Sequence, residues 1–394
     1  MSDGHSGIVM SMPVKYAMSV GDRAPPCIGI TAKGSVYSFE EQAGRTVVII
    51  LAKNLNAPGL VPLLASFSAQ ADEFHLHETD LIALIAEDVE RVFEFNFRHP
   101  SRVTLVGALN DFLERNKINK TLPDVLAGSP DEFMEQIGFD SAEPEVLILD
   151  RNLRVAGRIG TGDPENRCAT AMMIVKALPT ETPRDICAPA PVLILPNLLD
   201  LDLCRELVEL HQSGQTSDSP AFSPDAAGQM RHKLDYGLKK RRDFLLEREH
   251  PMHIQISDIL QRRCIPEIKR AFQADVSHTD RINVACYPGN GGHFRRHRDN
   301  RPDIVAYRKF ALSINLTLSA DGYEGGYLRL PEFNGHRYRC PPGAGVIFSV
   351  ALLHEITPVL SGNRYVLITH LHDDEGEVKW QQMRETLVKM DMAM

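Results

Sequence analysis

The sequence has no surplus of basic residues. Its 43 lysines and arginines are outnumbered by 52 aspartates and glutamates, which gives a formal net charge of -9 and a pI near 5.9. A protein that binds nucleic acid in general neutralises phosphates with an excess of Lys and Arg. We therefore expect no nucleic-acid partner.

Long apolar runs are also missing. The longest is TVVIILA at residues 46–52, far short of the roughly 20 residues that a membrane-spanning helix needs. The first twenty residues lack the charged start and the continuous apolar centre of a secretory signal. We expect no membrane contact and a cytoplasmic location.

Paired cysteines are absent as well. The seven cysteines are odd in number, widely spread and without a C-x-x-C pair. This pattern excludes a disulfide framework and a zinc ribbon, and it predicts reduced, mostly buried thiols. The cysteines are Cys27, Cys168, Cys187, Cys204, Cys264, Cys286 and Cys340.

The length predicts two domains. A chain of 394 residues with 43% hydrophobic and 24% charged residues is globular but too long for one core of typical size. The proline-rich segment ALPTETPRDICAPAPVLILPN at 177–197 is the best linker candidate. We predict one domain over residues 1–180 and a second over 186–394.

The first domain is predicted to be an α/β sandwich. Short β-branched runs predict buried strands at 45–52 and 79–87, and apolar residues three and four apart predict a helix at 58–74. A second helix is expected at 89–97 and a strand–turn–strand unit at 144–160. Strands that alternate with helices and end in a hairpin favour this architecture.

Residues 18–165 resemble the peroxiredoxins and related redoxins of thioredoxin fold. The likeness rests on the opening VGDRAPPCIGITAKGSVYSFEEQAGRTVVIILA, with its G-D-x-A-P start before the first central strand. It implies a thioredoxin-like domain.

A peroxiredoxin needs a thiolate at the helix start that follows this strand. Here that place reads KNLNAPGLVPLL, and no cysteine occurs between Cys27 and Cys168. Thiol peroxidase activity is therefore disfavoured, and a binding, scaffolding or homodimerisation role is expected for this domain.

The second domain begins with helices and continues with strands. Asp200 is a plausible helix cap before Leu203, Leu207 and Leu210, and residues 250–272 supply further helix. Strands dominate from Arg281 onward. This order predicts helices that buttress a β-sandwich or barrel.

The segment YPGNGGHFRRHRDN at 287–300 contains candidate metal ligands. His293 and His297 would share one face of a helix, but the glycines before them oppose a helix and no Glu lies between them to act as a base. On a strand, His297 and Asp299 would face one way. His-x-Asp then supplies two ligands of the 2-His-1-carboxylate triad that holds non-haem Fe(II).

Two further residues fit this hypothesis. His354 follows His297 by enough residues for several barrel strands, and Arg364 lies beyond it on another apolar strand. A guanidinium group can bind both oxygens of a carboxylate.

Residues 281–372 closely resemble the prolyl-4-hydroxylase-like branch of the Fe(II)/2-oxoglutarate dioxygenases. The matching blocks are INVACYPGNGGHFRRHRDN, LSINLTLSADGYEGGYLRLPEF and CPPGAGVIFSVALLHEITPVLSGNRYVLITHLH. The likeness implies a mainly-β double-stranded β-helix, or jelly roll, as the C-terminal domain. It further implies that His297, Asp299 and His354 bind the iron, that Arg364 and Tyr287 contact 2-oxoglutarate, and that Asn315 or Thr317 is nearest to its second contact.

The resemblance implies a hydroxylase that acts on an unactivated C–H bond and releases succinate and CO2. Its cofactors would be Fe(II), 2-oxoglutarate, O2 and ascorbate as reductant, and its substrate a small molecule or a peptidyl residue. The alternative is a non-catalytic iron-binding sensor of oxygen or 2-oxoglutarate, or a binding protein.

Several charged residues near the site have open roles. His293 is a candidate substrate or supporting contact, whereas His370 and His372 are expected to have strand or surface roles. Alternation along a strand places Arg295 on the metal side, where it either attracts an acidic group or, as is more common for arginine, is solvated, and it turns Arg296 and Arg298 away from the iron. The basic run KKRRDFLL at 239–246 is either a solvated stretch before a helix or a surface that steers an anionic or peptide substrate.

Overall fold

The computed structural model describes residues 18–108, 128–180, 185, 189–224, 230–301, 305–319 and 322–391. The chain divides into two compact units, Met1–Thr182 and Pro183–Met394, and the boundary is close to the predicted linker. Cys187 and part of that linker lie outside the described residues. Within those residues, no helix combines the length and the apolar character needed to cross a bilayer.

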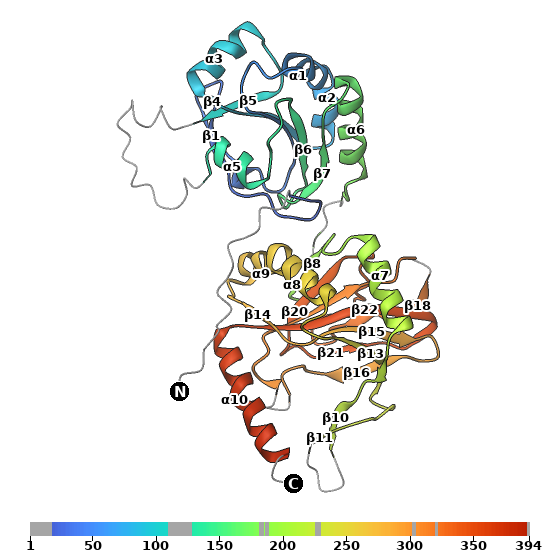
Figure 1. Ribbon diagram of the computed structural model, residues 1–394. Helices are drawn as coiled ribbons and strands as arrows, with labels where there is room; N and C mark the ends of the chain where they lie inside the picture. Colours follow the sequence, from blue (N-terminus) through green and yellow to red (C-terminus); the bar gives the residue numbers. More distant parts are fainter. Residues whose placement is uncertain are drawn as a thin grey trace, which may run out of the picture. The chain divides into compact units, whose positions relative to one another are not determined.

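The N-terminal unit is built on a seven-stranded mixed sheet in the order β2-β1-β5-β4-β3-β6-β7 (Figure 1). β3, β4 and β5 are parallel, and β6 and β7 follow as an antiparallel hairpin. These orders and directions are those of a thioredoxin-like sheet, so the predicted fold class is confirmed. The strands are β1 (Ile28–Thr31), β2 (Val36–Ser38), β3 (Thr46–Ala52), β4 (Thr79–Asp88), β5 (Thr104–Ala108), β6 (Glu145–Leu149) and β7 (Val155–Ile159).

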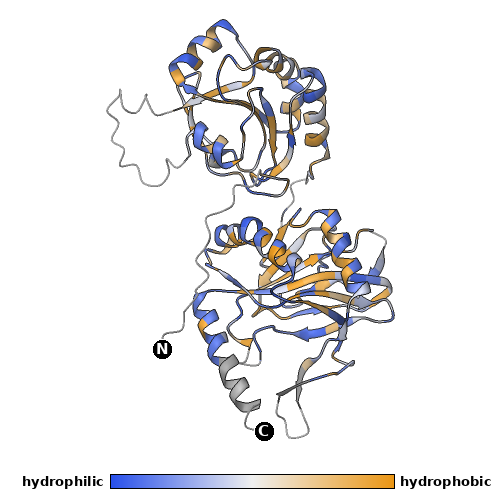
Figure 2. Ribbon diagram, viewed as in Figure 1, coloured by the Kyte–Doolittle hydropathy of each residue, from blue (hydrophilic) through white to orange (hydrophobic). Residues whose placement is uncertain are grey.

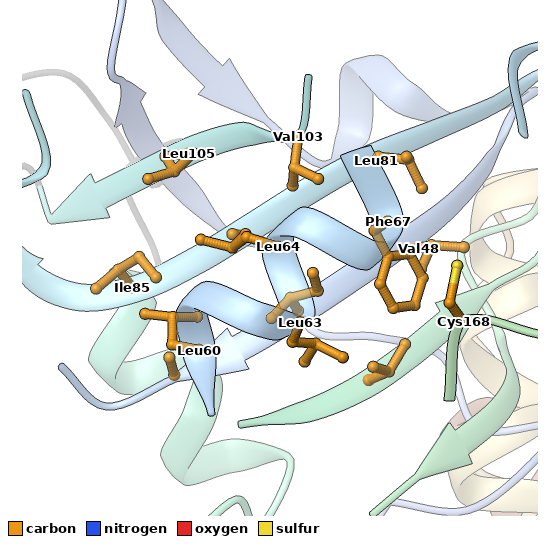
Figure 3. Packing of buried hydrophobic residues seen from close by; sticks show 14 of the residues in the cluster. Val48, Leu60, Leu63, Leu64, Phe67, Leu81, Ile85, Val103, Leu105 and Cys168 are labelled. Carbon is orange, nitrogen blue, oxygen red and sulfur yellow. The ribbon is translucent and has the colours of Figure 1, made fainter. Parts of the chain in front are cut away.

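Helices cover both faces of this sheet. They are α1 (Leu60–Ala69), α2 (Ala71–Leu76), α3 (Val89–Arg98), α5 (Pro130–Gln136) and α6 (Pro164–Ala177). Leu60, Leu63, Leu64 and Phe67 of α1 pack against the sheet and Cys168 of α6 (Figure 3). The single helix predicted at 58–74 was wrong in one respect, because the chain breaks it at Gln70, which caps both α1 and α2.

The C-terminal unit contains two main antiparallel sheets and a separate hairpin of β10 and β11. The larger runs β8-β20-β17-β22-β15-β13-β9 and the smaller runs β12-β16-β21-β19, which gives the predicted jelly roll (Figure 1). The strands are β8 (Val192–Leu195), β9 (Ser217–Asp218), β10 (Ala221–Pro224), β11 (Met230–Lys233), β12 (Lys239–Lys240), β13 (Arg242–Leu246), β14 (His278–Thr279), β15 (Ile282–Pro288), β16 (His293–His297), β17 (Phe310–Asn315), β18 (Tyr323–Gly325), β19 (Leu328–Arg329), β20 (Gly345–Ser349), β21 (His354–Ile356) and β22 (Val359–His372).

Alternation along the larger sheet separates two cores. Val284 and Leu312 belong to the core under the helices, whereas Ala285 and Ala311, one residue along, belong to the core shared with the smaller sheet. The helices are α7 (Leu201–Ser213), α8 (Pro251–Arg263), α9 (Ile265–Phe272) and α10 (Asp374–Asp391). α7, α8 and α9 bury their apolar residues against this sheet, and Figure 2 shows hydrophobic residues concentrated on its central strands.

The local sequence explains where helix α7 and strand β16 of this unit begin. The Asp200 side chain accepts a hydrogen bond from the backbone N–H of Leu203 at 2.8 Å, which confirms the predicted cap of α7. Gly291 at the turn between β15 and β16 has φ +94°, a conformation that favours glycine. The turn therefore delivers His293–His297 as a strand, and a helical pair of histidines is excluded.

Candidate metal centre

A β-bulge determines which side chains of β16 enter the site. Phe294 pairs with Ile356 of β21, but His297 pairs with His354, so one extra residue lies between the two pairs. Simple alternation is broken, and Phe294 comes to stack on His297 with ring centroids 3.4 Å apart. Arg295 is exposed, which agrees with the solvated alternative and not with a role on the metal side.

His297, Asp299 and His354 lie together. One potential ligand atom from each falls within 4.8 Å of the others. His297 Nε2 is 3.3 Å from Asp299 Oδ1, and His354 Nε2 is 3.4 Å from Asp299 Oδ2. β16 and the turn after it supply the first two groups and β21 the third, so residues distant in sequence meet because these strands pair.

The backbone orients both imidazoles. His297 Nδ1 faces the carbonyl oxygen of Arg295 at 2.7 Å, and His354 Nδ1 faces that of Leu352 at 3.0 Å. A carbonyl can only accept, so each Nδ1 carries the proton and each Nε2 keeps its lone pair for a metal. This donor set fits a divalent metal such as Fe(II).

The charge states also suit a metal. Burial and the neighbouring His354 lower the pKa of His297, which keeps that ring neutral. Burial would raise the pKa of Asp299, but the facing His354 and His370 hold it well below its ordinary value. Asp299 is therefore an anionic ligand group between neutral or positive rings.

His370 is a site residue that the sequence reasoning missed. Its Nε2 lies 3.2 Å from Asp299 Oδ2, and burial lowers its pKa. A surface role was therefore a wrong expectation. Counting by two along β22 from Arg364 reaches Ile368 and His370, and all three line one cavity, so strand periodicity could have indicated it. His372, by contrast, is buried and bonded to Glu377.

Arg364 and Tyr287 form the base of the cavity. They pair across β22 and β15, with the Arg364 guanidinium carbon 5.2 Å from the centre of the Tyr287 ring. Arg364 is 7% exposed, and its buried NH1 has no hydrogen-bond partner among the described residues. A buried, unsatisfied guanidinium nitrogen indicates a place for an anion, as a 2-oxoglutarate carboxylate would supply.

The predicted contact at Asn315 lacks this kind of support. The Asn315 amide donates to the Cys340 carbonyl at 2.8 Å and accepts from the Thr317 N–H at 3.2 Å. The Thr317 hydroxyl in turn accepts from the Tyr365 N–H at 2.9 Å. Ser313, two residues before Asn315 on the same strand, lines the cavity instead.

His293 points away from the ligand group. Its Nδ1 lies 2.8 Å from the Gly291 carbonyl oxygen, and its Nε2 lies 3.4 Å from that of Gly237. Arg296 and Arg298 turn from the ligand group and pair with Glu355 and Glu332, although Arg298 still lines the cavity.

The basic run forms strands β12 and β13 rather than a solvated stretch. Lys239 and Arg241 line a cavity of about 1360 Å³ that also contains His297, Asp299 and His354. Lys240 remains partly exposed and donates to the Asn290 carbonyl at 2.7 Å.

Comparison with known proteins agrees with this geometry. Residues 282–372 match the profile of the 2OG-Fe(II) oxygenase superfamily. These residues form a 2OG-Fe(II) oxygenase domain. A PKHD-type hydroxylase of Alteromonas mediterranea is 34% identical over 95 residues, which cover 24% of this chain and 40% of that protein. One of Nitrobacter winogradskyi is 26% identical over 179 residues, covering 43% and 74%.

The chain thus spans less than half the length of the first of these relatives. Two solved structures are similar at low sequence identity. A prolyl-4-hydroxylase of Pseudomonas putida has 17% identity and a TM-score of 0.38, covering 46% of this chain and 92% of its own. A peroxidoxin of Mycobacterium tuberculosis has 14% identity and a TM-score of 0.32, covering 41% and 99%.

Proposed function

We propose that the C-terminal unit is an Fe(II)- and 2-oxoglutarate-dependent hydroxylase of the prolyl-hydroxylase-like kind. The observation that carries the proposal is the pairing of a metal donor set, His297, Asp299 and His354, with the unsatisfied Arg364 in one cavity. When bound, iron with 2-oxoglutarate and O2 supplies the oxidation of an unactivated C–H bond, with succinate and CO2 as products.

The protein's own residues bind and orient in this proposal. His297, Asp299 and His354 hold the metal on one side of the cavity, and His370 holds Asp299 through its second oxygen. Arg364 binds the distal carboxylate of 2-oxoglutarate, with Tyr287 packed beside it. Phe294 covers one face of the His297 ring and keeps that ligand from water.

The test is succinate formation by purified protein supplied with Fe(II), 2-oxoglutarate and O2, with ascorbate proposed as the reductant. Candidate substrates are prolyl peptides, free amino acids and small metabolites, because an iron site does not determine what is oxidised. His297→Ala is the matched inactive control. Tightly bound iron without succinate in any substrate pool would favour the sensor alternative and refute this proposal.

We further propose that the N-terminal unit acts in binding, with a second copy of this chain as its partner. The lack of a cysteine at the start of α1 and the 89% exposed Phe97 on α3 support this role. Sedimentation of wild type and Phe97→Asp tests it, since a dimer through this face would dissociate in the variant. The six described cysteines are free thiols, which supports a reducing, cytoplasmic compartment.

A further inference from the structure

Lys239 is a buried ammonium group inside the cavity. The residue is 8% exposed, and its Nζ donates to the Pro220 carbonyl oxygen at 3.2 Å. Among the described residues it forms no ion pair with a carboxylate. An ammonium has three donors, so this group is buried with most of its hydrogen-bonding capacity unused, which is costly unless a ligand uses it.

The adjacent carboxylate does not neutralise it. Both oxygens of Asp243 accept from Arg241, at 2.7 and 2.6 Å, and one also accepts from the Ser219 hydroxyl at 2.6 Å. Asp243 therefore pairs with Arg241, and it forms no ion pair with Lys239. Burial, and then the nearby Arg241, lower the pKa of Lys239 to about 7, although Asp243 and Asp299 act in the opposite direction. A bound anion would therefore favour the ammonium form at neutral pH.

Lys239 also lies beside the candidate metal ligands. It pairs with Phe294 across β12 and β16, and its Nζ is 4.8 Å from the centre of the Phe294 ring. That ring stacks on His297. A single phenyl ring thus contacts both the ammonium and a metal-binding imidazole, so a molecule positioned for oxidation at the metal comes within reach of Lys239.

Lys239 and Arg364 line the same cavity from different sheets, Lys239 from β12 and Arg364 from β22. The cavity of about 1360 Å³ is much larger than 2-oxoglutarate requires, and it extends to Arg248 and Trp380. Arg364 is the unsatisfied cation that would bind the distal carboxylate of 2-oxoglutarate. The co-substrate has only one such carboxylate, so Lys239 is free to bind another anion.

We propose that Lys239 binds a carboxylate of the substrate, so that the substrate class is an acidic molecule or an acidic peptide segment. The inference rests on the proposed hydroxylase function, because it assigns the remaining volume of the cavity to a substrate. Such a carboxylate would supply the counter-ion that Asp243 cannot, in a site where partial burial strengthens the pair.

The test measures binding without turnover. Full-length protein is loaded with Mn(II) and 2-oxoglutarate, and probe affinities are measured by isothermal titration calorimetry. N-acetyl-L-proline is compared with N-acetyl-L-prolinamide for a free carboxylate. Acetyl-Pro-Glu-amide is compared with acetyl-Pro-Gln-amide, and acetyl-Glu-Pro-amide with acetyl-Gln-Pro-amide, for a peptidyl one. Each pair differs only in the acidic group.

We expect one of these carboxylates to bind about 10- to 100-fold more tightly than its amide, as a charge-assisted hydrogen bond allows. Lys239→Met should reduce this ratio to less than about twofold while leaving the amide's affinity unchanged, and Lys239→Arg should retain part of it. Lys240→Met, at the exposed neighbour, is the matched control and should keep the wild-type ratio.

Equal binding of every carboxylate and its amide to wild type would overturn the proposal, as would a preference that survives in Lys239→Met. Thermal unfolding of each variant checks that the fold is intact, and Lys239→Arg gives a second reading if the methionine variant is unstable. Failure of the proposed function would look different, because succinate would then not form from any substrate pool, whether or not Mn(II) and 2-oxoglutarate bind to the wild-type protein.

Discussion

The two units of this chain place their reactive side chains in opposite ways. In the N-terminal unit the helix that follows the first central strand starts at Gly59 and Leu60, with no thiol. Its cysteines are buried, and burial raises the pKa of Cys27 to about 12. In the C-terminal unit, ligand atoms from distant strands converge within one cavity.

The difference lies in a few polar residues. Both units bury continuous apolar cores of similar kind, and either sheet could carry a site at its strand ends. Function follows from the side chains positioned there and not from the fold itself. Substitutions in each unit therefore test whether these side chains account for the difference.

The largest effect is expected at the proposed metal ligands. His297→Ala removes one of three donors, so iron affinity should fall by more than the 10- to 100-fold typical of a supporting residue, and succinate formation should be lost. His293→Ala should keep stoichiometric iron, because His293 bonds to backbone carbonyls outside the ligand group. Iron content by inductively coupled plasma spectrometry, measured after dialysis, separates the two. Full iron in His297→Ala would refute the assignment.

Arg364→Ala should act next most strongly, and on the co-substrate alone. Truncating one member of a buried charge pair costs roughly 2 to 5 kcal/mol, which weakens 2-oxoglutarate binding by about 30-fold or more. Iron binding should be unchanged. The control is Arg296→Ala, whose guanidinium is exposed and paired with Glu355 at 3.2 Å. Calorimetric titration of 2-oxoglutarate into the Mn(II)-loaded proteins gives the measurement, and equal affinity in all three proteins would contradict it.

His370 tests whether the site extends beyond its three ligands. His370→Phe leaves Asp299 Oδ2 without this partner, so iron affinity should fall by about 10- to 100-fold. His370→Gln, which can still donate to the carboxylate, should recover part of it. The visible absorption spectrum of the Co(II)-loaded protein should shift in the phenylalanine variant, whereas loss of packing alone would leave it unchanged.

His370 also marks where prediction from sequence ended. The strands, the cap of α7 and the pair His297 and Asp299 follow from local patterns, because β-branched runs, Asp200 and His-x-Asp each act over a few residues. His354 is far along the chain, and only the family resemblance indicated it as the third candidate ligand. The pairing of β16 with β21 is a long-range property, and its bulge moved Phe294 into the cavity where alternation placed Arg295. No pattern within β16 itself indicates that extra residue.

The basic run shows the same limit. Charge density alone could not tell that Lys239 is buried and that the Arg241 side chain is only 10% exposed, whereas Lys240 is partly exposed. β12 is two residues long, and its burial depends on what packs over it. Likewise, the hydrogen bonds that occupy Asn315 come from Cys340 and Thr317, and only the folded chain shows the first of them.

Acid should change the stability of the two units in opposite directions at two buried aspartates. Burial would raise the pKa of Asp280, but Arg308 and His370 lower it to about 2. Its contribution to C-terminal stability is therefore present above pH 4 and is lost as the pH falls towards 2. Burial raises the pKa of Asp150 in the N-terminal unit despite its backbone hydrogen bonds. The buried charge of Asp150 therefore destabilises this unit at neutral pH, and protonation in acid removes that cost.

The measurement is urea unfolding between pH 6 and 2. Trp380, the sole tryptophan, reports on the C-terminal unit, which should lose stability first. Asp280→Asn should cost about 2 kcal/mol at neutral pH and flatten the dependence below pH 4. Asp258→Asn, a half-exposed partner of Arg262, is the control and should change neither. An unaltered acid slope in Asp280→Asn would show that another group is responsible.

The smallest effect is expected at the thiols of the N-terminal unit. A peroxide-reducing cysteine must be a thiolate at neutral pH, but burial raises the pKa values of Cys27 and Cys168. Hydrogen peroxide consumption with a thiol reductant should therefore match the buffer rate in wild type, Cys27→Ala and Cys168→Ala alike. Metal-free protein must be used, so that iron chemistry in the C-terminal unit does not contribute. If the wild type consumed peroxide catalytically and either alanine variant did not, the N-terminal unit would be an enzyme. The two units would then differ in the reaction that they catalyse, and not in whether they catalyse one.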